Sequence, residues 1–222
     1  MSETTPAAPM IVSVNVGRPK AVAQAGRTVV TAIWKRPVEG RVAARGVNLD
    51  GDQQADRQVH GGPDKAVYAY AGEDTGWWEA ELGRPLGPGA FGENLTTAGL
   101  DVTGAVIGER WAIGTAVFEV CQPRTPCGKL GLRMGDVRFP RRFAHALRPG
   151  AYLRIVTEGH VGAGDPIEVV SRPAHGVTVG LVAEADLDPT LAPRLVAATE
   201  LAEGWLAWAR EQDAAVRAGE GR

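Results

Sequence analysis

A cysteine between two cationic side chains is the strongest chemical signal in this sequence. Cys127 lies in the stretch QPRTPCGKL, three residues after Arg124 and two residues before Lys129. Neighbouring positive charges favour a thiolate, so we expect them to lower the pKa of this thiol. A thiolate is a nucleophile and a ligand for soft metals. The flanking prolines and Gly128 predict an irregular, exposed backbone at this point.

The second cysteine has a different setting. Cys121 ends the apolar run AVFEVC, which is typical of a strand. Buried thiols are common and inert, so we expect Cys121 to be a packing residue. The sequence begins without a secretory signal, which favours two reduced thiols over a disulfide.

Two further stretches contain polar residues next to glycine. In DRQVHGGPDKAVYAY, the N–H groups of Gly61 and Gly62 can surround an anion, Lys65 can add a positive charge, and His60 can act as a ligand or proton donor. A simple turn leading into a strand explains Gly-Gly-Pro-Asp equally well. Both interpretations stay open at this point.

The other stretch is GAFGENLTTAGL, which places Glu93 and Asn94 between glycines and a leucine. A carboxylate and an amide can bind the edge of a heterocycle, and a capped turn explains the same residues equally well. The sequence has no Walker loop, dinucleotide fingerprint, HExxH or CxxC motif. Its four histidines are scattered, so it offers little support for a zinc site and selects no base for a Cys-His hydrolase.

Charge and hydropathy exclude some classes of partner. The chain has 222 residues, with 24 Lys and Arg against 26 Asp and Glu, and a formal net charge of -2. This balance argues against binding to a nucleic acid duplex, which requires a basic surface. No apolar run is long enough to cross a bilayer. We therefore expect a cytoplasmic protein with no membrane partner.

Short runs rich in β-branched and aromatic residues dominate the first three quarters of the chain. They cover residues 11–17, 27–35, 66–70, 116–121, 151–156 and 166–172. This spacing predicts a mainly β fold, either a barrel or a closed, mostly antiparallel sheet. Residues 73–83 and 138–148 are predicted to be helices that cover its ends.

The chain ends differ from this central region. Residues 1–9 show no periodicity and predict a disordered tail. Residues 10–173 are expected to form the main domain, and the alanine- and leucine-rich residues 174–222 a small domain of three short helices. In the last helix, Leu201, Trp205 and Trp208 fall on one face.

Taken together, these stretches resemble the MOSC domains, named for the carboxy-terminal domain of molybdenum cofactor sulfurase, and among them the YiiM-like group. The resemblance extends from IVSVNVG through GDQQADRQVHGGPDKAVYAY, GAFGENLTTAGLDVTGAVIGERWAIG and FEVCQPRTPCGKL to RPGAYLRIV and GHVGAGDPIEVVSRP. Six blocks in the same order cover nearly the whole chain. One departure is Glu109, where relatives usually have Asp.

The resemblance implies a MOSC-type β-barrel that binds the pterin-based molybdenum cofactor, Mo-molybdopterin. The position of Cys127 matches the cysteine that ligates molybdenum in the family. In that setting, donors to the cofactor are expected from His60, Gly61, Gly62, Lys65, Arg124, Thr125 and Lys129, and Asn94 is expected at the pterin edge or the substrate.

The resemblance also implies a reductase of N-hydroxylated compounds such as hydroxylaminopurines, and a small carboxy-terminal domain of three helices. Two cysteines cannot hold a usual iron-sulfur cluster, so electrons are expected from a separate reductase, a flavin or iron-sulfur protein. A cofactor carrier without turnover and a persulfide-based sulfur-transfer protein are the alternatives. The last helices could cover the core, dimerise the protein or dock the reductase.

Overall fold

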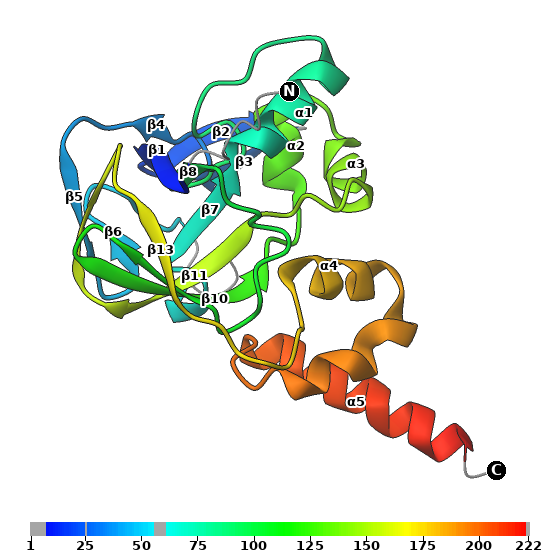
Figure 1. Ribbon diagram of the computed structural model, residues 1–222. Coiled ribbons are helices and arrows are strands. Elements are labelled where there is room, and N and C mark those ends of the chain that lie inside the picture. The colour runs from blue at the N-terminus through cyan, green and yellow to red at the C-terminus, as the bar shows by residue number, and fades with distance from the viewer. Residues whose placement is uncertain (1–7, 25, 56–60, 221–222) are drawn as a thin grey trace, which may run out of the picture.

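The computed structural model describes residues 8–24, 26–55 and 61–220 of the chain, in a fold dominated by β-sheet (Figure 1). The largest sheet has eight strands in the order β13-β9-β10-β11-β7-β8-β1-β4. Their bounds are Met10–Val16 for β1, Arg36–Pro37 for β4, Val67–Ala71 for β7, Leu95–Ala98 for β8, Arg110–Ile113 for β9, Ala116–Pro123 for β10, Ala151–Thr157 for β11 and Ile167–Ser171 for β13. All neighbours pair antiparallel except β7 and β8, which are parallel.

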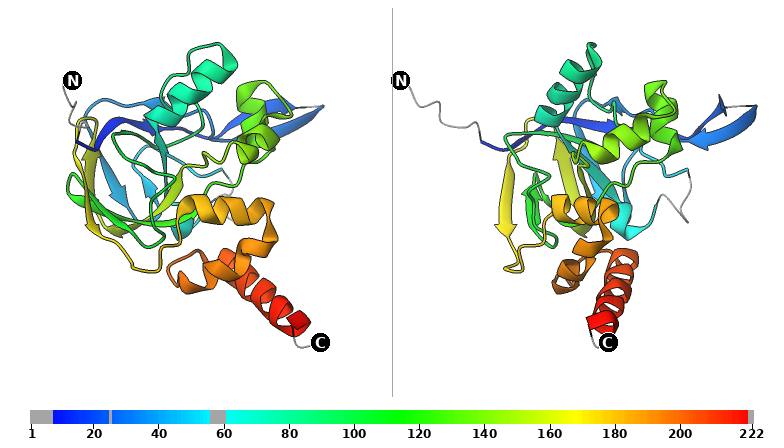
Figure 2. Two further views of the ribbon diagram at one scale, coloured as in Figure 1. Left: turned by 45° about the vertical axis from the view of Figure 1, so that its right-hand side comes forward. Right: turned by 90° about the vertical axis from the view of Figure 1, so that its right-hand side faces the viewer.

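Two smaller sheets complete the β structure. One has the order β12-β5-β6, with β12 at Gly159–Gly162, β5 at Arg41–Arg45 and β6 at Asn48–Leu49. The other is a hairpin of β2, Lys20–Gln24, and β3, Arg27–Thr31, which projects from the body of the molecule (Figure 2). All six predicted β runs contain a strand, because the preference of β-branched and aromatic residues for strands is local.

A closed barrel is not confirmed. The strand order of the large sheet ends at β13 on one side and β4 on the other. Hydrogen bonds do link the chain at the start of β1 to the start of β13 and the turn before it: Ile11 N–H donates to Asp165 O at 2.9 Å, and Ile167 N–H of β13 donates to Pro9 O at 2.8 Å. The observed fold is therefore a mixed, sheet-dominated structure with covering helices.

The two predicted covering helices are present as α1, Gly72–Leu82, and α3, Phe139–His145. α1 stops at Gly83, which adopts a left-handed φ of 62°. The expectation of an irregular backbone throughout QPRTPCGKL is wrong at both ends. β10 runs to Pro123, and a short helix α2, Gly128–Met134, starts directly after Cys127. Pro126 does not interrupt α2, because it lies before the N-cap residue Cys127 and outside the helix.

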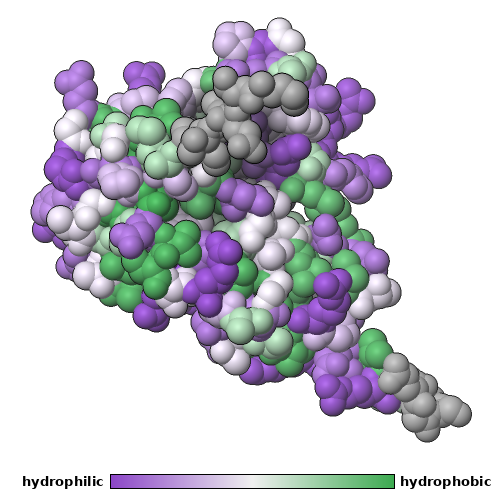
Figure 3. Space-filling model, viewed as in Figure 1, coloured by the Kyte–Doolittle hydropathy of each residue, from purple (hydrophilic) through white to green (hydrophobic). Residues whose placement is uncertain are grey.

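Apolar side chains form two clusters on either side of the large sheet. One lies among the strands and extends to the C-terminal helices. The other is mainly aromatic and lies between β7 and the helices α1 to α3; its large members are Tyr68, Tyr70, Trp78, Phe91, Phe139 and Phe143. Figure 3 shows a further apolar area on the surface over β13, where Val169 and Val170 are exposed.

The C-terminal region contains α4, Val179–Leu187, a 3-10 segment η2, Pro189–Ala197, and α5, Glu203–Glu220. α5 begins after Leu201, so the predicted apolar face is shifted: Leu206 and Ala209 are buried, whereas Trp205 and Trp208 are half-buried. Side chains from this region belong to the same apolar cluster as the strands. Its status as a separate domain stays a prediction. None of the helices within the described ranges is long and apolar enough to cross a membrane.

Candidate functional site

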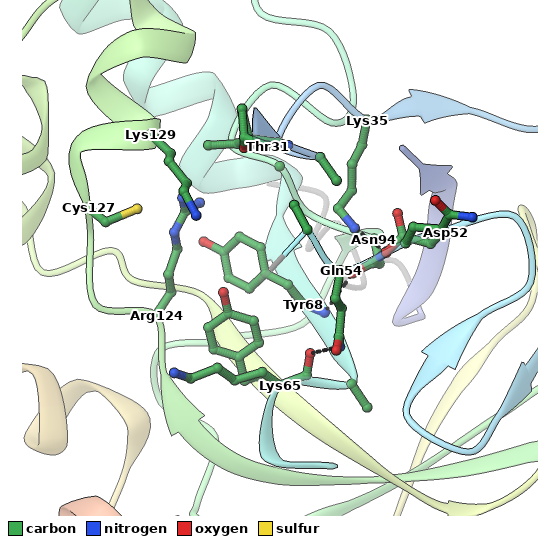
Figure 4. A pocket seen from close by; sticks show the side chains of 17 residues that line it. Thr31, Lys35, Asp52, Gln54, Lys65, Tyr68, Asn94, Arg124, Cys127 and Lys129 are labelled. Carbon is green, nitrogen blue, oxygen red and sulfur yellow. Dashed lines mark hydrogen bonds and ion pairs between the residues drawn. The ribbon is translucent and has the colours of Figure 1, made fainter. Parts of the chain in front are cut away.

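The sulfur of Cys127 points into the pocket drawn in Figure 4. The pocket has a volume of about 640 Å³, including its open mouth, which is the size of a typical small-molecule site. Its walls come from the end of β3 and the residues after it, the loop 52–55, the start of β7, the residue pair Arg124 and Cys127, and β11. The lining residues are Thr31, Ala32, Ile33, Lys35, Asp52, Gln53, Gln54, Ala55, Lys65, Ala66, Tyr68, Gly92, Asn94, Arg124, Cys127, Lys129 and Tyr152.

The two cysteines have opposite environments. Cys127 is half-buried and immediately precedes α2 in extended conformation. Cys121 is fully buried in β10, and its thiol donates to Asp64 O at 3.1 Å and to Tyr152 O at 3.2 Å. Burial raises the pKa of the Cys121 thiol well above its ordinary value. Cys121 is thus the buried packing residue that the sequence predicted, and Cys121 and Cys127 are not joined by a disulfide.

Arg124 supplies a buried cation beside Cys127. Its side chain donates to the carbonyl of Phe91, and its guanidinium lies 5.2 Å from the centre of the Tyr68 ring. Burial alone would lower the pKa of Arg124, but Tyr68, Tyr152 and Cys127 raise it, and the net shift is upward. The guanidinium therefore remains charged in the pocket wall.

A pair of tyrosines lines the pocket beside Arg124. Tyr68 of β7 and Tyr152 of β11 are direct partners in the antiparallel pairing, with ring centres 5.1 Å apart. The Tyr68 hydroxyl donates to Pro149 O at 2.8 Å. Burial raises the pKa of both phenols, so both are neutral at physiological pH. Sequence reasoning missed them, although both lie in runs that it assigned to strands.

On the opposite wall is a buried ion pair that sequence reasoning also missed. Lys35 Nζ lies 2.5 Å from Asp52 Oδ2, and Asp52 Oδ1 accepts a hydrogen bond from Gly17 N–H at 2.7 Å. Asn94 Nδ2 donates to Asp52 Oδ2 at 3.0 Å. Burial lowers the pKa of Lys35, and this effect exceeds the opposing effect of Asp52. A lysine directly after the apolar residues of AIWK was the sequence feature that could have indicated this buried ion pair.

The stretch that contains Glu93 and Asn94 was interpreted either as a binding site for a heterocycle or as a capped turn. The structure shows a capped turn at Glu93. Glu93 is buried and accepts from Gly89 N–H at 2.5 Å, Phe91 N–H at 3.0 Å and the Thr96 hydroxyl at 3.0 Å. Burial raises the pKa of this carboxyl. Glu93 therefore closes the loop and does not line the pocket.

Asn94 does line the pocket, but the hydrogen bonds of its amide are made to other parts of the protein. Its Oδ1 accepts from Tyr68 N–H at 3.1 Å, and its Nδ2 donates to Asn15 O at 3.2 Å as well as to Asp52. These bonds join β7, β1 and the loop after β6. The expected contact of Asn94 with a pterin or substrate stays a prediction.

Five predicted site residues meet in this pocket: Lys65, Asn94, Arg124, Cys127 and Lys129. The others lie elsewhere or cannot be placed. Gly61 borders an adjoining hollow that it shares with Lys65, and Thr125 is exposed and borders a hollow behind the cysteine loop. Gly62 N–H was expected to donate to an anion, but it donates to Gln54 Oε1 at 3.2 Å within the fold. His60 lies outside the described residues.

Positive charge dominates the lining. Among the lining residues that the structure describes, four side chains are cationic, those of Lys35, Lys65, Arg124 and Lys129, and one is a carboxylate, that of Asp52. This balance suits an anionic organic ligand. Within the described part of the chain, no three His, Cys, Asp or Glu side chains gather to hold a metal ion. Cys127 can add a soft donor to a metal that arrives with ligands of its own.

Comparison with known proteins places this pocket in a family. Residues 56–168, which include both Cys127 and Lys65, match the MOSC domain. The chain belongs to the MOSC domain family. Within this family it is 37% identical to YflK of Bacillus subtilis (strain 168) over 89% of this chain and 91% of that protein. It is 33% identical to YiiM of Escherichia coli (strain K12) over 79% of this chain and 81% of that protein.

One further comparison supports the YiiM-like assignment of this MOSC protein, and another relates the chain to a protein named as a reductase. A crystal structure of YiiM from Geobacillus stearothermophilus superposes with a TM-score of 0.75 at 29% identity, covering 92% of this chain and 98% of that one. A protein of Gibberella moniliformis named "Reductase" is 33% identical over 76% of this chain, which corresponds to 30% of its own length. The resemblance predicted from the sequence is thus confirmed.

Proposed function

We propose that this MOSC protein binds the pterin-based molybdenum cofactor in the Cys127 pocket and reduces N-hydroxylated compounds such as hydroxylaminopurines. The observation that carries this proposal is a sulfur directed into a pocket whose walls are strongly cationic. Membership of the MOSC family and similarity to a protein named as a reductase support it.

The lining residues fit the chemistry of this cofactor. Its phosphate and its two sulfurs carry negative charge, which Lys65, Arg124 and Lys129 can balance. Cys127 provides a thiolate for a soft metal, in a pocket with no competing set of protein ligands among the residues described. When bound, the molybdenum centre supplies the two-electron chemistry that cleavage of an N–O bond requires.

The protein itself contributes positioning and protons. The overall conversion takes up two electrons and two protons, breaks the N–O bond, and yields an amine and water. The Lys35 ammonium holds a proton at the pocket wall, and its lowered pKa makes it a stronger acid than an exposed lysine. Asp52 keeps this side chain in place and Asn94 in turn holds Asp52, while Tyr152 adds a neutral hydrogen-bond donor.

The test compares two cysteine variants prepared from cells that make the cofactor. For Cys127→Ala, we expect loss of bound molybdenum and pterin and a fall of hydroxylaminopurine reduction to background, because the thiolate ligand is gone. Cys121→Ala is the matched control and should keep both, since that thiol is buried in β10. Turnover is measured with dithionite as electron source. Full activity of Cys127→Ala would refute the proposed role.

The same material separates the two alternatives. Bound cofactor without reduction of any N-hydroxylated compound would identify a cofactor carrier. Sulfur released by cyanide from metal-free wild-type protein, and absent from Cys127→Ala, would identify a persulfide-based transfer protein.

A further inference from the structure

The segment that follows Cys127 concentrates positive charge in a chain whose overall charge is negative. Residues 127–148 contain six Lys and Arg residues and one acidic residue, Asp136, whereas the whole chain has 24 basic and 26 acidic residues. The segment forms α2, α3 and the turn between them, which we call the α2–α3 surface. Such a local excess creates a positive potential that attracts an oppositely charged partner.

Three arginines in the turn and in α3 are exposed and weakly paired, whereas Arg148 at the end of the segment pairs with Asp74. The Arg138 side chain is 88% exposed, and Arg141 and Arg142 are exposed beside it. Asp136 lies 3.9 Å from Arg138 Nε and 4.0 Å from Arg142 NH1, the outer limit for an ion pair. A single carboxylate cannot balance three guanidinium groups. Figure 3 shows hydrophilic residues on the side of the molecule that carries α3.

An exposed apolar side chain lies next to one of these arginines in the chain. Val137, in the turn between α2 and α3, is 88% exposed and has Arg138 as its neighbour. Protein interfaces commonly combine an apolar centre with a polar or charged rim. An exposed valine next to an exposed arginine is therefore a suitable anchor for a protein partner.

The α2–α3 surface is rigid and close to the site. Leu130 of α2 and Phe139 and Phe143 of α3 are buried in the aromatic cluster, which holds both helices against β7. α2 starts directly after Cys127 and has seven residues, so it carries the chain about 10 Å from that sulfur. A carrier bound here would bring its redox group near the pocket.

A second cationic segment lies beside the first. Residues 17–38 contain five Lys and Arg residues and no acidic residue. They form the β2–β3 hairpin and its flanks, and the hairpin lies next to α2 and α3 in both views of Figure 2. Thr31 and Lys35 from this segment line the pocket. Cationic elements therefore border the pocket on two sides.

We propose that the α2–α3 surface is the docking site of an acidic electron-carrier protein, which supplies the reducing electrons. This inference rests on the proposed function, because the described residues and the motifs offer no second redox group in the chain. The carrier gives up two electrons, the N–O bond breaks, and two protons from solvent complete the amine and water. Opposite charge accelerates encounter and orients the carrier, so binding must weaken with salt.

The experiment uses an acidic FMN-containing flavodoxin as the probe. The test variant is Arg138→Glu/Arg141→Glu/Arg142→Glu. The matched control is Arg194→Glu/Arg210→Glu/Arg217→Glu, which makes the same change of charge in the C-terminal helical region, away from the pocket. Binding is measured by calorimetric titration at 50 and 300 mM NaCl, and turnover is measured with reduced flavodoxin and, separately, with dithionite.

We expect the wild type and the control to bind flavodoxin at low salt and to lose most of this affinity at high salt. The test variant should show at least a tenfold weaker affinity and a tenfold higher KM for flavodoxin, with unchanged dithionite-driven turnover. Val137→Asp, a single exposed change that should not affect folding, is expected to weaken binding in the same direction.

Three results would overturn docking at this surface: no binding of flavodoxin by the wild type at 50 mM NaCl, equal loss of affinity in the test and control variants, or unchanged affinity in the test variant. A wild type that binds flavodoxin but fails to reduce any substrate with dithionite would instead contradict the proposed function. The binding measurement does not depend on turnover, so the two failures are distinguishable.

Discussion

At the level of single residues, position in the fold decides what each thiol and amine can do. Cys121 and Cys127 are six residues apart, yet one is enclosed by β10 and its neighbours and the other faces a pocket. Burial raises the pKa of the Cys121 thiol and removes it from chemistry. Similarly, burial lowers the pKa of the Lys35 ammonium and makes it a better acid.

The Lys35 and Asp52 pair gives a stability prediction. Both side chains are largely buried, with exposures of 11% and 3%. Lys35→Met leaves a buried carboxylate without its cation, which should lower the free energy of unfolding by about 3 kcal/mol. Lys35→Met/Asp52→Asn is the control and should recover part of this loss, since it removes the unpaired charge. Urea denaturation measures both; an equal loss in the two variants would contradict the argument.

The same lysine gives a pH dependence of known sign. Its folded-state pKa lies below the ordinary 10.5, so between these two values the unfolded chain binds more protons than the folded one. The contribution of Lys35 to the free energy of unfolding therefore rises with pH in this interval and is lost as pH falls through the folded-state pKa. Lys35→Met should lack this contribution when the two stability profiles are compared.

At the level of elements, close packing of loops against strand ends shapes the pocket. Gly92 lines the pocket with a positive φ of 78°, and Ile33 follows β3 on the adjacent wall. A Cβ atom on Gly92 would lie 2.8 Å from Ile33 Cγ1 and 3.2 Å from Ile33 O. Both the backbone conformation and the contact therefore require glycine at this position.

Gly92→Ala should lower the free energy of unfolding by about 1–3 kcal/mol and displace the wall that contains Ile33. Gly87→Ala lies in the same loop and is the matched control: it has no positive φ, and its Cβ would meet no atom within 4 Å. We expect the control to keep wild-type stability and cofactor content. Equal thermal stability of the two variants would show that the Gly92 contact is unimportant.

At the level of the whole molecule, the C-terminal helical region is tied to the strands that support the site. Ala202 N–H donates to Cys121 O at 3.1 Å, and Arg154 of β11 donates to Glu200 O at 2.6 Å. The same arginine pairs with Asp64, which precedes β7, and with Glu119 of β10. Helices and sheet also share one apolar cluster, so we expect them to unfold together.

Leu206→Ala tests this coupling. Leu206 is 8% exposed and belongs to the shared cluster, so its truncation should lower the free energy of unfolding by about 2–4 kcal/mol. Calorimetry should show one transition moved to lower temperature. Val216→Ala, at a position 44% exposed on the same helix, is the control and should change little. Two separate transitions in either protein would contradict a shared core.

Local patterns in the sequence predicted several elements of the fold and some residues of the pocket. Runs rich in β-branched and aromatic residues located six strands, a terminal Gly83 ended α1, and charges beside Cys127 singled out the thiol that faces the pocket. These signals succeed because strand periodicity, helix termination and nearest-neighbour charge act over a few residues. The same kind of reasoning missed α2, because Pro126 and Gly128 are typical of a loop, whereas α2 begins at Gly128.

Only the tertiary structure decided which distant residues share the pocket. Lys35 meets Asp52 and Asn94 through packing of separate loops, and Tyr68 meets Tyr152 through the register of β7 and β11. The tertiary structure also places Glu93 in a turn and pairs the Gly62 N–H with Gln54. Neither group takes the ligand-binding role that the sequence had left open. The reason is physical: strand register and loop packing are set by contacts between segments far apart in the chain, which no local pattern of residues specifies.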